Sequence, residues 1–278
     1  MNTPPTEARK PDAYAHLPWG IRRLVDPERR RRTKRRMVKR FQQWKRLVVP
    51  PRIANMTFSQ RVSFARKTAL IHRQVKCKHQ HEHVDSFVDA FMALPPEVEG
   101  CIVEAGCFQG GSAAKFSLAA KLAGRRVVLF DSFEGLPENK EGHAKSILGH
   151  SIDGWFGGGR FSGSLEAVKH NIATYGHLDV CSFVEGWFED SMPGFSEKVC
   201  AIYLDVDLAS STRTCIKYLY PLLVPGGILM SQDGDFPLVI EVFDDDEFWK
   251  TEVGCAKPHI EGLGRDKMIR IVKPADAR

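Results

Sequence analysis

Short apolar runs alternate with helix-like segments along the chain from Gly100 onward. The runs are almost continuously apolar, which is typical of strands that a parallel sheet buries on both faces. The segments between them carry apolar residues at helical spacing. We therefore expect a doubly wound, Rossmann-like α/β fold. The pattern predicts strands at 101–105, 126–131, 180–184, 200–205, 227–231 and 268–272, and helices at 111–123, 164–175 and 210–220.

The region before these strands has a different pattern. Residues 1–20 hold four prolines and little apolar periodicity, which predicts a disordered leader. Residues 21–50 are predicted to form a basic amphipathic helical extension, because apolar residues recur there at spacings of four, three and four. Residues 51–278 are predicted to form the domain that carries the chemistry. The apolar stripe of the extension consists of Met37, Phe41, Trp44 and Val48.

Positive charge is concentrated in that extension. The whole chain has a net charge of +6, but residues 21–46 alone contribute +11 and leave −5 for the rest. A mildly acidic body is not suited to polyanions, and the chain has no zinc-finger spacing and no basic, aromatic-interleaved sheet, so no nucleic-acid partner is expected. Residues 21–48 either pack their stripe on the domain or lie on an anionic membrane surface.

The cysteines and the apolar segments indicate a compartment. Seven cysteines are scattered, odd in number and mostly within apolar runs, which indicates reduced thiols packed as small hydrophobic groups. The N-terminus has no signal-peptide pattern, and no apolar segment approaches the roughly 20 residues that cross a bilayer. We expect a cytoplasmic protein, peripheral to the inner face of the membrane if the basic extension docks there.

The turn after the first predicted strand is rich in residues that suit a cofactor. Gly106, Gly110 and Gly111 let the backbone turn sharply and approach a ligand, and Glu104 places a carboxylate at the end of the strand. A nicotinamide-binding turn has the pattern G-x-G-x-x-G, whose second glycine is missing here. An acid at this place fits a ligand with a positive amino group better than a diphosphate.

A second acid lies where a ribose is bound in such folds. Asp131 ends the second predicted strand 21 residues after Gly110, and a carboxylate there accepts hydrogen bonds from both ribose hydroxyls. The third strand ends at 185–188, where an aromatic pair either borders an adenine ring or belongs to the core. The candidate cofactor-binding residues are Glu104, Gly106, Gly110, Gly111, Ser112, Asp131, Ser132, Glu185, Gly186 and Trp187.

Five sequence blocks between roughly residue 100 and residue 233 carry a resemblance to a known family. They are VEAGCFQGGS at 103–112, FDSFEGLP at 130–137, GWFED at 186–190, LDVDLASST at 204–212 and LYPLLVPGG at 219–227. In this order they resemble the macrocin O-methyltransferase (TylF-type) family of antibiotic-sugar methyltransferases. The resemblance implies the seven-stranded sheet of class I methyltransferases, S-adenosylmethionine as methyl donor, and commonly a magnesium ion at the acceptor hydroxyl.

The chain departs from the family pattern at three places. The strand after Pro-Gly-Gly typically ends in Asp-Asp in the family, whereas Gln232 and Asp233 stand at those positions. The family's Tyr after Asp-x-Asp-Leu is Ala209 here, which alters the expected acceptor pocket. The basic N-terminal extension has no counterpart in the family pattern.

Carboxylates follow the fourth and fifth predicted strands. Asp205 and Asp207 end one strand, Asp233 and Asp235 end the next, and all four are expected to converge because these strand ends are neighbours. Residues two apart share one face of an extended segment, so Asp205 and Asp207 can combine a metal ligand with a base. We expect Asp205 and Asp233 as metal ligands with Gln232 beside them, and Asp205 and Asp207 as catalytic residues. Capping of the following helices is the alternative for each acid.

Histidines offer two further candidate sites. The first is a set in which every second residue is a cysteine or histidine: Cys77, His79, His81 and His83. Such residues share one side of a strand but spread around a helix, and their spacing is not the usual one of zinc ligands. His143 and His150 lie in a glycine-containing loop long enough to cover an acceptor, and either is a candidate base.

Three functions are compatible with these residues. The first is an S-adenosylmethionine-dependent O-methyltransferase that acts on a sugar hydroxyl of a natural product or glycan, with help from magnesium. The second is a catechol-type O-methyltransferase, because two vicinal ring hydroxyls satisfy the same metal geometry. The third is a protein that binds the cofactor without turnover, since one acid of the family pattern is replaced by Gln232. A homo-oligomer is compatible with all three.

Overall fold

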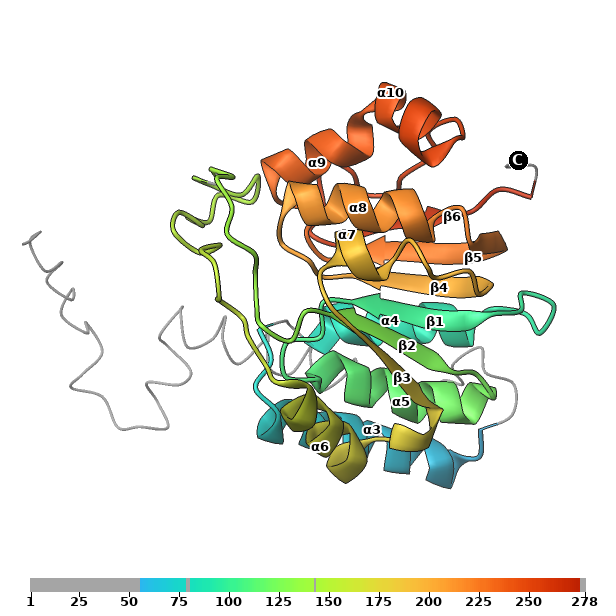
Figure 1. Ribbon diagram of the computed structural model, residues 1–278. Coiled ribbons are helices and arrows are strands. Elements are labelled where there is room, and N and C mark those ends of the chain that lie inside the picture. Colours follow the sequence, from blue (N-terminus) through green and yellow to red (C-terminus); the bar gives the residue numbers. More distant parts are fainter. Residues whose placement is uncertain (1–55, 79–80, 143, 276–278) are drawn as a thin grey trace, which may run out of the picture. The chain divides into compact units, whose positions relative to one another are not determined.

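A six-stranded sheet forms the centre of the part of the chain that the structure describes. The computed structural model describes residues 56–78, 81–142 and 144–275. Five strands are parallel in the order β3-β2-β1-β4-β5, and β6 pairs antiparallel with β5 (Figure 1). The strands are β1 (Cys101–Ala105), β2 (Val127–Asp131), β3 (Cys181–Glu185), β4 (Val199–Leu204), β5 (Leu223–Ser231) and β6 (Ile269–Val272).

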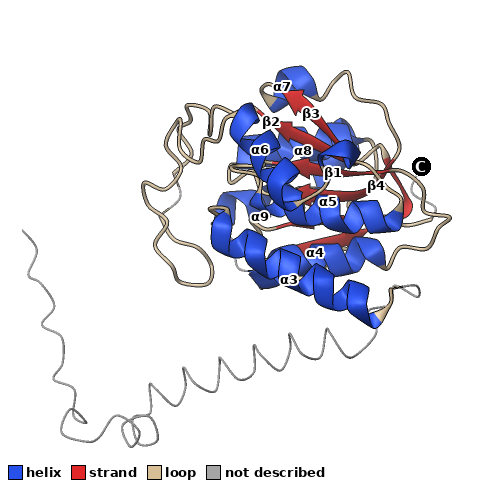
Figure 2. Cartoon of the chain, turned by 90° about the horizontal axis from the view of Figure 1, so that it is seen from below, coloured by secondary structure: helices blue, strands red, loops and turns tan. Residues whose placement is uncertain are grey.

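Helices cover both faces of this sheet. Figure 2 shows four of them side by side on one face: α3 (Phe58–Gln74), α4 (His81–Met92), α5 (Gly111–Ala123) and α6 (Leu165–Tyr175). A short 3₁₀ turn, η1 (Leu178–Val180), lies between α6 and β3. The other face carries α7 (Phe188–Ser191), α8 (Ala209–Leu219), α9 (Pro237–Asp244), α10 (Asp246–Phe248) and the π-helical turn η2 (Trp249–Val253).

Alternation along the strands separates two hydrophobic cores, one on each face. Val103 and Ala105 of β1 pack in the core that contains α8 and α9, whereas Ile102 packs in the core that contains α4 and α5. Side chains of successive strand residues point to opposite faces, so a strand covered by helices on both sides is apolar along most of its length. All five residues of β1 are buried, and Glu104 is the one charged residue among them.

The predicted fold class is confirmed, and every predicted strand overlaps an observed one. The family resemblance leads us to expect seven strands, whereas the described residues form six. Beside β6, Glu261 and Arg270 pair in a single isolated bridge. Gly262 and Gly264 follow with φ angles of 85° and 69°, which a strand does not adopt, so pairing stops after one residue.

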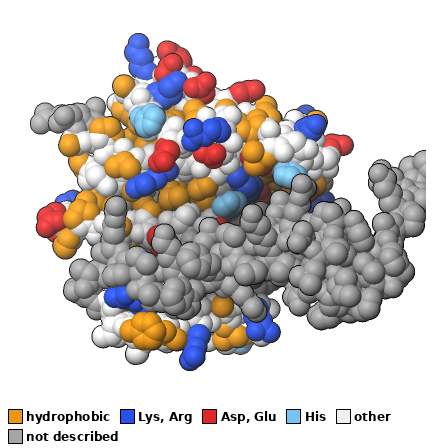
Figure 3. All heavy atoms as spheres, turned by 180° about the vertical axis from the view of Figure 1, so that it is seen from behind, with side chains coloured by type: hydrophobic (Ala, Val, Ile, Leu, Met, Phe, Trp, Pro, Cys, Tyr) orange, Lys and Arg blue, Asp and Glu red, His pale blue; other side chains and the backbone are white. Residues whose placement is uncertain are grey.

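Several predictions concern parts of the chain outside the described residues. These are the leader at 1–20, the basic extension at 21–50, His79 and His143. Among the residues that are described, no helix is both long enough and apolar enough to cross a membrane. The seven cysteines, all within the described ranges, form no disulfide bond. On the face seen in Figure 3, described side chains of both charges are interspersed with hydrophobic ones.

Candidate active site

A cavity of about 310 Å³ opens at the carboxyl ends of the parallel strands. Turns that follow all five parallel strands contribute to its lining, as expected for an open parallel sheet. The sequence-predicted residues that line it are Gly106, Asp131, Ser132, Gly186, Trp187, Asp205, Asp207, Gln232 and Asp233. The predicted residues Glu104, Gly110, Gly111, Ser112 and Glu185 are not part of the lining.

The turn after β1 depends on Gly106. Its φ angle is 87°, in the left-handed region that favours glycine. A Cβ atom at this position would lie 2.0 Å from the backbone carbonyl oxygen of Asp205. The absence of a side chain therefore allows the turn after β1 to lie directly against the turn after β4, which carries the predicted catalytic acids.

Asp131 connects the same turn to the end of β2. Its Oδ2 accepts hydrogen bonds from the backbone N–H groups of Cys107 at 2.5 Å and Phe108 at 3.3 Å, and its Oδ1 accepts one from Phe133 at 2.7 Å. Burial raises the pKa of Asp131, and these hydrogen bonds oppose the rise. Each carboxylate oxygen has two lone pairs, so the group retains capacity to accept a ligand hydroxyl from the cavity.

Glu104 lies fully buried behind the turn. It accepts a hydrogen bond from the Ser112 hydroxyl, and its Oε2 has no hydrogen-bond partner among the described residues. Burial raises the pKa of Glu104 well above its ordinary value, and the charges of Asp205 and Asp131 raise it further. A partnerless carboxyl oxygen close to two other carboxylates is a place where a nearby cation would be stabilising.

The remaining predicted cofactor residues lie outside the cavity lining. Gly110 is the N-cap of α5 with a φ angle of 78°. Gly111 lies against Cys77. A Cβ atom added at Gly111 would lie 3.6 Å from the Cβ of Cys77. Glu185 pairs in register with Asp131 at the end of β3, where its side chain is exposed.

Three carboxylates meet on the other side of the cavity. Asp205, Asp207 and Asp233 offer oxygen atoms that all lie within 4.8 Å of one another. The Oδ2 of Asp233 accepts hydrogen bonds at 3.0 Å from the N–H groups of Val206 and Asp207. Asp207 has a φ angle of 61°, which is unusual for a residue other than glycine. The turn after β4 is thus held in a strained conformation by an acid of the next strand.

Repulsion among these acids changes how they hold protons. Burial raises the pKa of Asp207 well above its ordinary value, and the charges of Asp233 and Asp205 add to the rise. Burial and the charge of Asp205 raise the pKa of Asp233 to about 7, against the opposing charge of Lys267. Three carboxylate oxygens at a partly buried site suit a divalent cation such as Mg²⁺, which would remove the repulsion among the three carboxylates.

Gln232 and Asp235 flank this cluster but also interact elsewhere. The Oε1 of Gln232 accepts a hydrogen bond at 2.8 Å from the hydroxyl of Tyr203, which is buried. An oxygen of Asp235 lies 2.9 Å from the ammonium nitrogen of Lys267. The predicted convergence of four carboxylates is wrong for Asp235, which is not in the group of three that comes together and pairs with Lys267.

The sequence did not single out the aromatic wall of the cavity. Phe108 and Phe161 pack edge to face with ring centroids 6.2 Å apart, and Phe156 packs on Phe236 at 5.1 Å. All four rings line the cavity. Phe156 and Phe161 come from the loop between β2 and α6, which the sequence predicts as a cover, but aromatic residues in an irregular loop have no periodic signal. His150 lies on this loop, exposed and outside the cavity lining.

The alternating cysteine and histidine set does not follow a strand. Helix α4 begins at His81, so His81 and His83 lie on a helix and Cys77 precedes it. Alternating residues spread around a helix, which removes the geometric argument for zinc. In the described ranges, the group of potential metal ligands that comes together is the three aspartates.

Comparison with known proteins agrees with this geometry. The family model of the macrocin-O-methyltransferases (TylF) matches residues 73–252. The chain belongs to this family. The match contains the glycine turn, Asp131 and the three clustered aspartates, and every residue that lines the cavity except Lys267.

Individual TylF-family relatives match over a smaller span. An 8-demethyl-8-(2,3-dimethoxy-alpha-L-rhamnosyl)-tetracenomycin-C 4'-O-methyltransferase of Streptomyces olivaceus is 36% identical over 148 residues, which are 50% of this chain and 55% of the relative. A mycinamicin III 3''-O-methyltransferase of Micromonospora griseorubida is 29% identical over 150 residues, 52% of this chain and 59% of the relative. The chain thus spans little more than half the length of the curated relatives it matches.

Solved structures share the fold. The O-methyltransferase NovP superposes with a TM-score of 0.55 at 24% identity and covers 69% of this chain and 78% of its own. The calicheamicin methyltransferase CalS11 superposes with a TM-score of 0.54 at 20% identity over 88% of this chain and 93% of its own. At these identities the likeness concerns the fold alone.

Proposed function

We propose that this TylF-family chain is an S-adenosylmethionine-dependent O-methyltransferase whose acceptor is a sugar hydroxyl on a small molecule or glycan. The observation that carries the proposal is a single cavity lined by the glycine turn, Asp131 and a cluster of three aspartates. Family membership supports the reaction class. The names of the matched relatives, which describe O-methyl transfer to glycosylated compounds, support a sugar as the acceptor.

We assign the methyl donor to the side of the cavity formed by Gly106, Asp131 and Trp187. Asp131 would accept hydrogen bonds from the ribose hydroxyls, and Gly186 with Trp187 would border the adenine ring. The partnerless oxygen of Glu104 lies behind this side and favours a cationic amino group nearby. A positively charged sulfonium donor fits a site with this excess of carboxylates better than a diphosphate cofactor does.

We assign a divalent cation, most simply Mg²⁺, to Asp205, Asp207 and Asp233, with Gln232 beside them. When bound, the cation lowers the pKa of the acceptor hydroxyl and holds a neighbouring hydroxyl. Gln232 contributes at most a neutral amide oxygen, because the family's acid is absent at this position. The site therefore carries one negative charge fewer than the family pattern implies.

The protein's own part in the reaction is alignment and proton removal. Methyl transfer is an in-line displacement, so the acceptor oxygen must point at the methyl carbon along the carbon–sulfur axis. The turns after β1 and β4 touch at Gly106 and Asp205, which places the two halves of the cavity at a fixed separation. Asp207 lies in the same cluster, so when Asp205 and Asp233 hold the cation, Asp207 would be placed to take the proton that the acceptor hydroxyl loses.

The catechol-type and the non-catalytic alternatives are each favoured by a different observation. The aromatic wall, with Phe156 and Phe236, would also accept a catechol ring beside the same cluster. The hydrogen bond between Gln232 and Tyr203 gives Gln232 a structural role, which suits a protein that binds the cofactor without turnover.

Incubation of the full chain with labelled S-adenosylmethionine and a panel of glycosides, catechols and glycolipid extracts tests the proposal. We expect the label to be transferred to a glycoside, and we expect EDTA to abolish this transfer. Transfer to catechols alone would support the catechol-type alternative. Calorimetric binding of S-adenosylmethionine without transfer to any acceptor and without a response to Mg²⁺ would support the non-catalytic one.

We further propose, from the sequence alone, that residues 21–48 dock the enzyme on anionic membranes near a lipid-linked acceptor. Basic side chains around an apolar stripe bind such surfaces. In sedimentation with vesicles containing phosphatidylserine, the full chain should pellet more than a chain that starts at Arg52. Equal pelleting of both chains would refute the proposal.

A further inference from the structure

The loop between β2 and α6, within residues 132–164, connects the aromatic wall to the acid-bearing turns (Figure 1). Trp155, Phe156 and Phe161 of this loop line the cavity. The N–H group of Ile147 donates a hydrogen bond at 2.9 Å to the backbone carbonyl of Asp235, in the turn after β5. The same loop therefore contacts both the cavity and the turn after β5, which carries Asp233.

Glu141 of this loop caps the helix that follows the carboxylate cluster. Helix α8 has Leu208 at its N-cap, which offers no side-chain hydrogen bond. The Oε2 of Glu141 accepts a hydrogen bond from the N–H of Ala209 at 2.7 Å. Its Oε1 accepts bonds from the N–H of Ser210 at 2.9 Å and the Ser210 hydroxyl at 2.6 Å. A carboxylate here satisfies two free N–H groups and is stabilised by the helix dipole.

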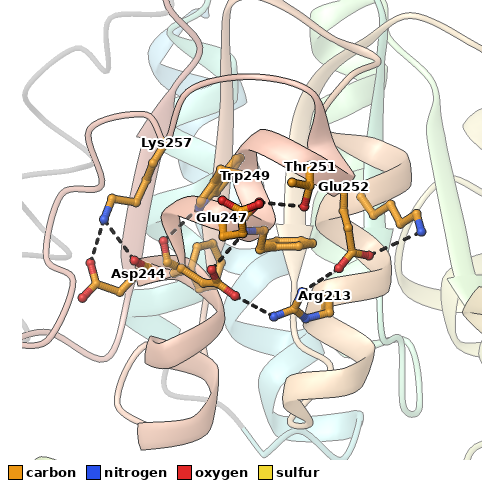
Figure 4. A network of polar contacts seen from close by, with 11 residues as sticks. Arg213, Asp244, Glu247, Trp249, Thr251, Glu252 and Lys257 are labelled. Atoms are coloured by element: carbon orange, nitrogen blue, oxygen red, sulfur yellow. Dashed lines mark hydrogen bonds and ion pairs between the residues drawn. The ribbon is translucent and has the colours of Figure 1, made fainter.

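The turn that bears the acids is thus held from two sides. Asp233 binds the N–H groups of Val206 and Asp207, and Glu141 binds the two N–H groups that start α8 immediately afterwards. The body of α8 is fixed independently, because Arg213 pairs with Asp245 at 2.8 Å and with Glu252 at 2.7 Å (Figure 4). With the helix fixed, the cap acts on the turn between β4 and α8.

A polar side chain connects this cap to the aromatic wall. The amide nitrogen of Asn139 donates a hydrogen bond at 2.6 Å to the backbone carbonyl of Phe156. The side-chain oxygen of Asn139 accepts one at 3.2 Å from the backbone N–H of Glu141. One side chain therefore connects the backbone of Phe156 to the backbone of Glu141.

We propose that Glu141 is a positioning residue that couples closure of this loop to the geometry of Asp205 and Asp207. The proposal rests on the proposed function, since it takes these acids as the groups that act at the acceptor. With Phe156 in place, Glu141 caps α8 and the turn has one conformation. When the loop leaves the cavity, the cap is lost, and the strained turn at Asp207 relaxes.

The variant Glu141→Gln tests the coupling, with Glu138→Gln as the matched control. Glu138 lies on the same loop with an exposed side chain outside the cavity lining. Hydrogen exchange by mass spectrometry should show faster exchange in Glu141→Gln both in the loop and in residues 205–212, and no change in the control. Mn²⁺ affinity, measured by electron paramagnetic resonance, should fall roughly tenfold, as for other residues that orient metal ligands. Affinity for S-adenosylmethionine should stay the same.

The outcomes separate the coupling from the proposed function. Exchange in residues 205–212 that is unchanged in Glu141→Gln overturns the coupling, whether or not the enzyme turns over any acceptor. An equal loss of Mn²⁺ and S-adenosylmethionine affinity also overturns it, because that result indicates general damage. Failure of the wild-type chain to methylate any acceptor refutes the proposed function, and the exchange measurement, which needs neither metal nor turnover, still decides the coupling.

Discussion

Acidic residues at the strand ends share a side-chain chemistry but differ in what surrounds them. Asp131 accepts three backbone hydrogen bonds, which stabilise its charged form. Glu104 accepts one hydrogen bond and is otherwise enclosed by apolar groups and other acids, which stabilises its neutral form. Asp207 is half-buried beside two further carboxylates and tends to take up a proton or a cation. Surroundings, more than residue type, separate the proposed roles of donor binding and proton transfer.

Replacement of Asp131 by Asn should weaken binding of S-adenosylmethionine by about tenfold or more. The amide nitrogen cannot accept the hydrogen bonds that the lost oxygen received, and a charged acceptor for the ribose disappears; each such bond contributes about 1.5–3 kcal/mol. Isothermal titration measures the change. The exposed neighbour Glu134, replaced by Gln, serves as the control and should bind normally. Equal affinities of Asp131→Asn and wild type would remove Asp131 from the donor site.

Glu104 gives a pH dependence with a definite sign. Its pKa in the folded chain is raised above the ordinary value of 4.5, so its stabilising contribution is complete below pH 4.5 and is lost as the pH rises through the folded pKa. Glu104→Gln stays neutral at every pH. The stability of this variant relative to wild type should therefore rise by about 1.4 kcal/mol per pH unit from pH 4.5 up to the folded pKa of Glu104, and stay constant above it. Urea unfolding between pH 5 and 8 measures the difference, and a difference independent of pH would show that Glu104 is not buried as a neutral acid.

At the scale of elements, the site depends on turns that touch across the sheet. Gly106→Ala should destabilise the fold by clearly more than the 1–2 kcal/mol of a left-handed alanine, because the new Cβ also meets the Asp205 carbonyl. Gly124→Ala isolates the conformational part, since its φ angle is 64° and nothing lies within 4 Å of the added carbon. Chemical denaturation of both variants gives the comparison. Equal losses for the two alanines would mean that the turns after β1 and β4 are not in tight contact.

The elements were largely predictable from the chain, because strands buried on both faces leave continuous apolar runs and the acids directly follow them. The pattern predicts β1 and α5 with their observed bounds. The pairing of Lys267 with Asp235 and the cap from Glu141 were not predictable, since each joins residues far apart in the sequence. Loop contacts of this kind depend on tertiary packing and have no periodicity that a sequence reading can detect.

At the scale of the whole molecule, the topology brings the proposed donor and metal halves of the site together. The order β3-β2-β1-β4-β5 places the turn after β1 between the turns after β2 and β4. Asp131 therefore lies on one side of Gly106 and Asp205 on the other. Two cores on opposite faces hold the strands in register, so the fold sets the separation between the strand ends that carry Asp131 and Asp205.

The most direct test of this account is a crystal structure of the chain with S-adenosylhomocysteine and Mn²⁺, with anomalous data for manganese. We expect an anomalous peak among Asp205, Asp207 and Asp233, and a ribose whose hydroxyls lie within hydrogen-bond distance of Asp131 in the same cavity. A manganese peak elsewhere, or a nucleoside bound away from the turn after β1, would contradict it.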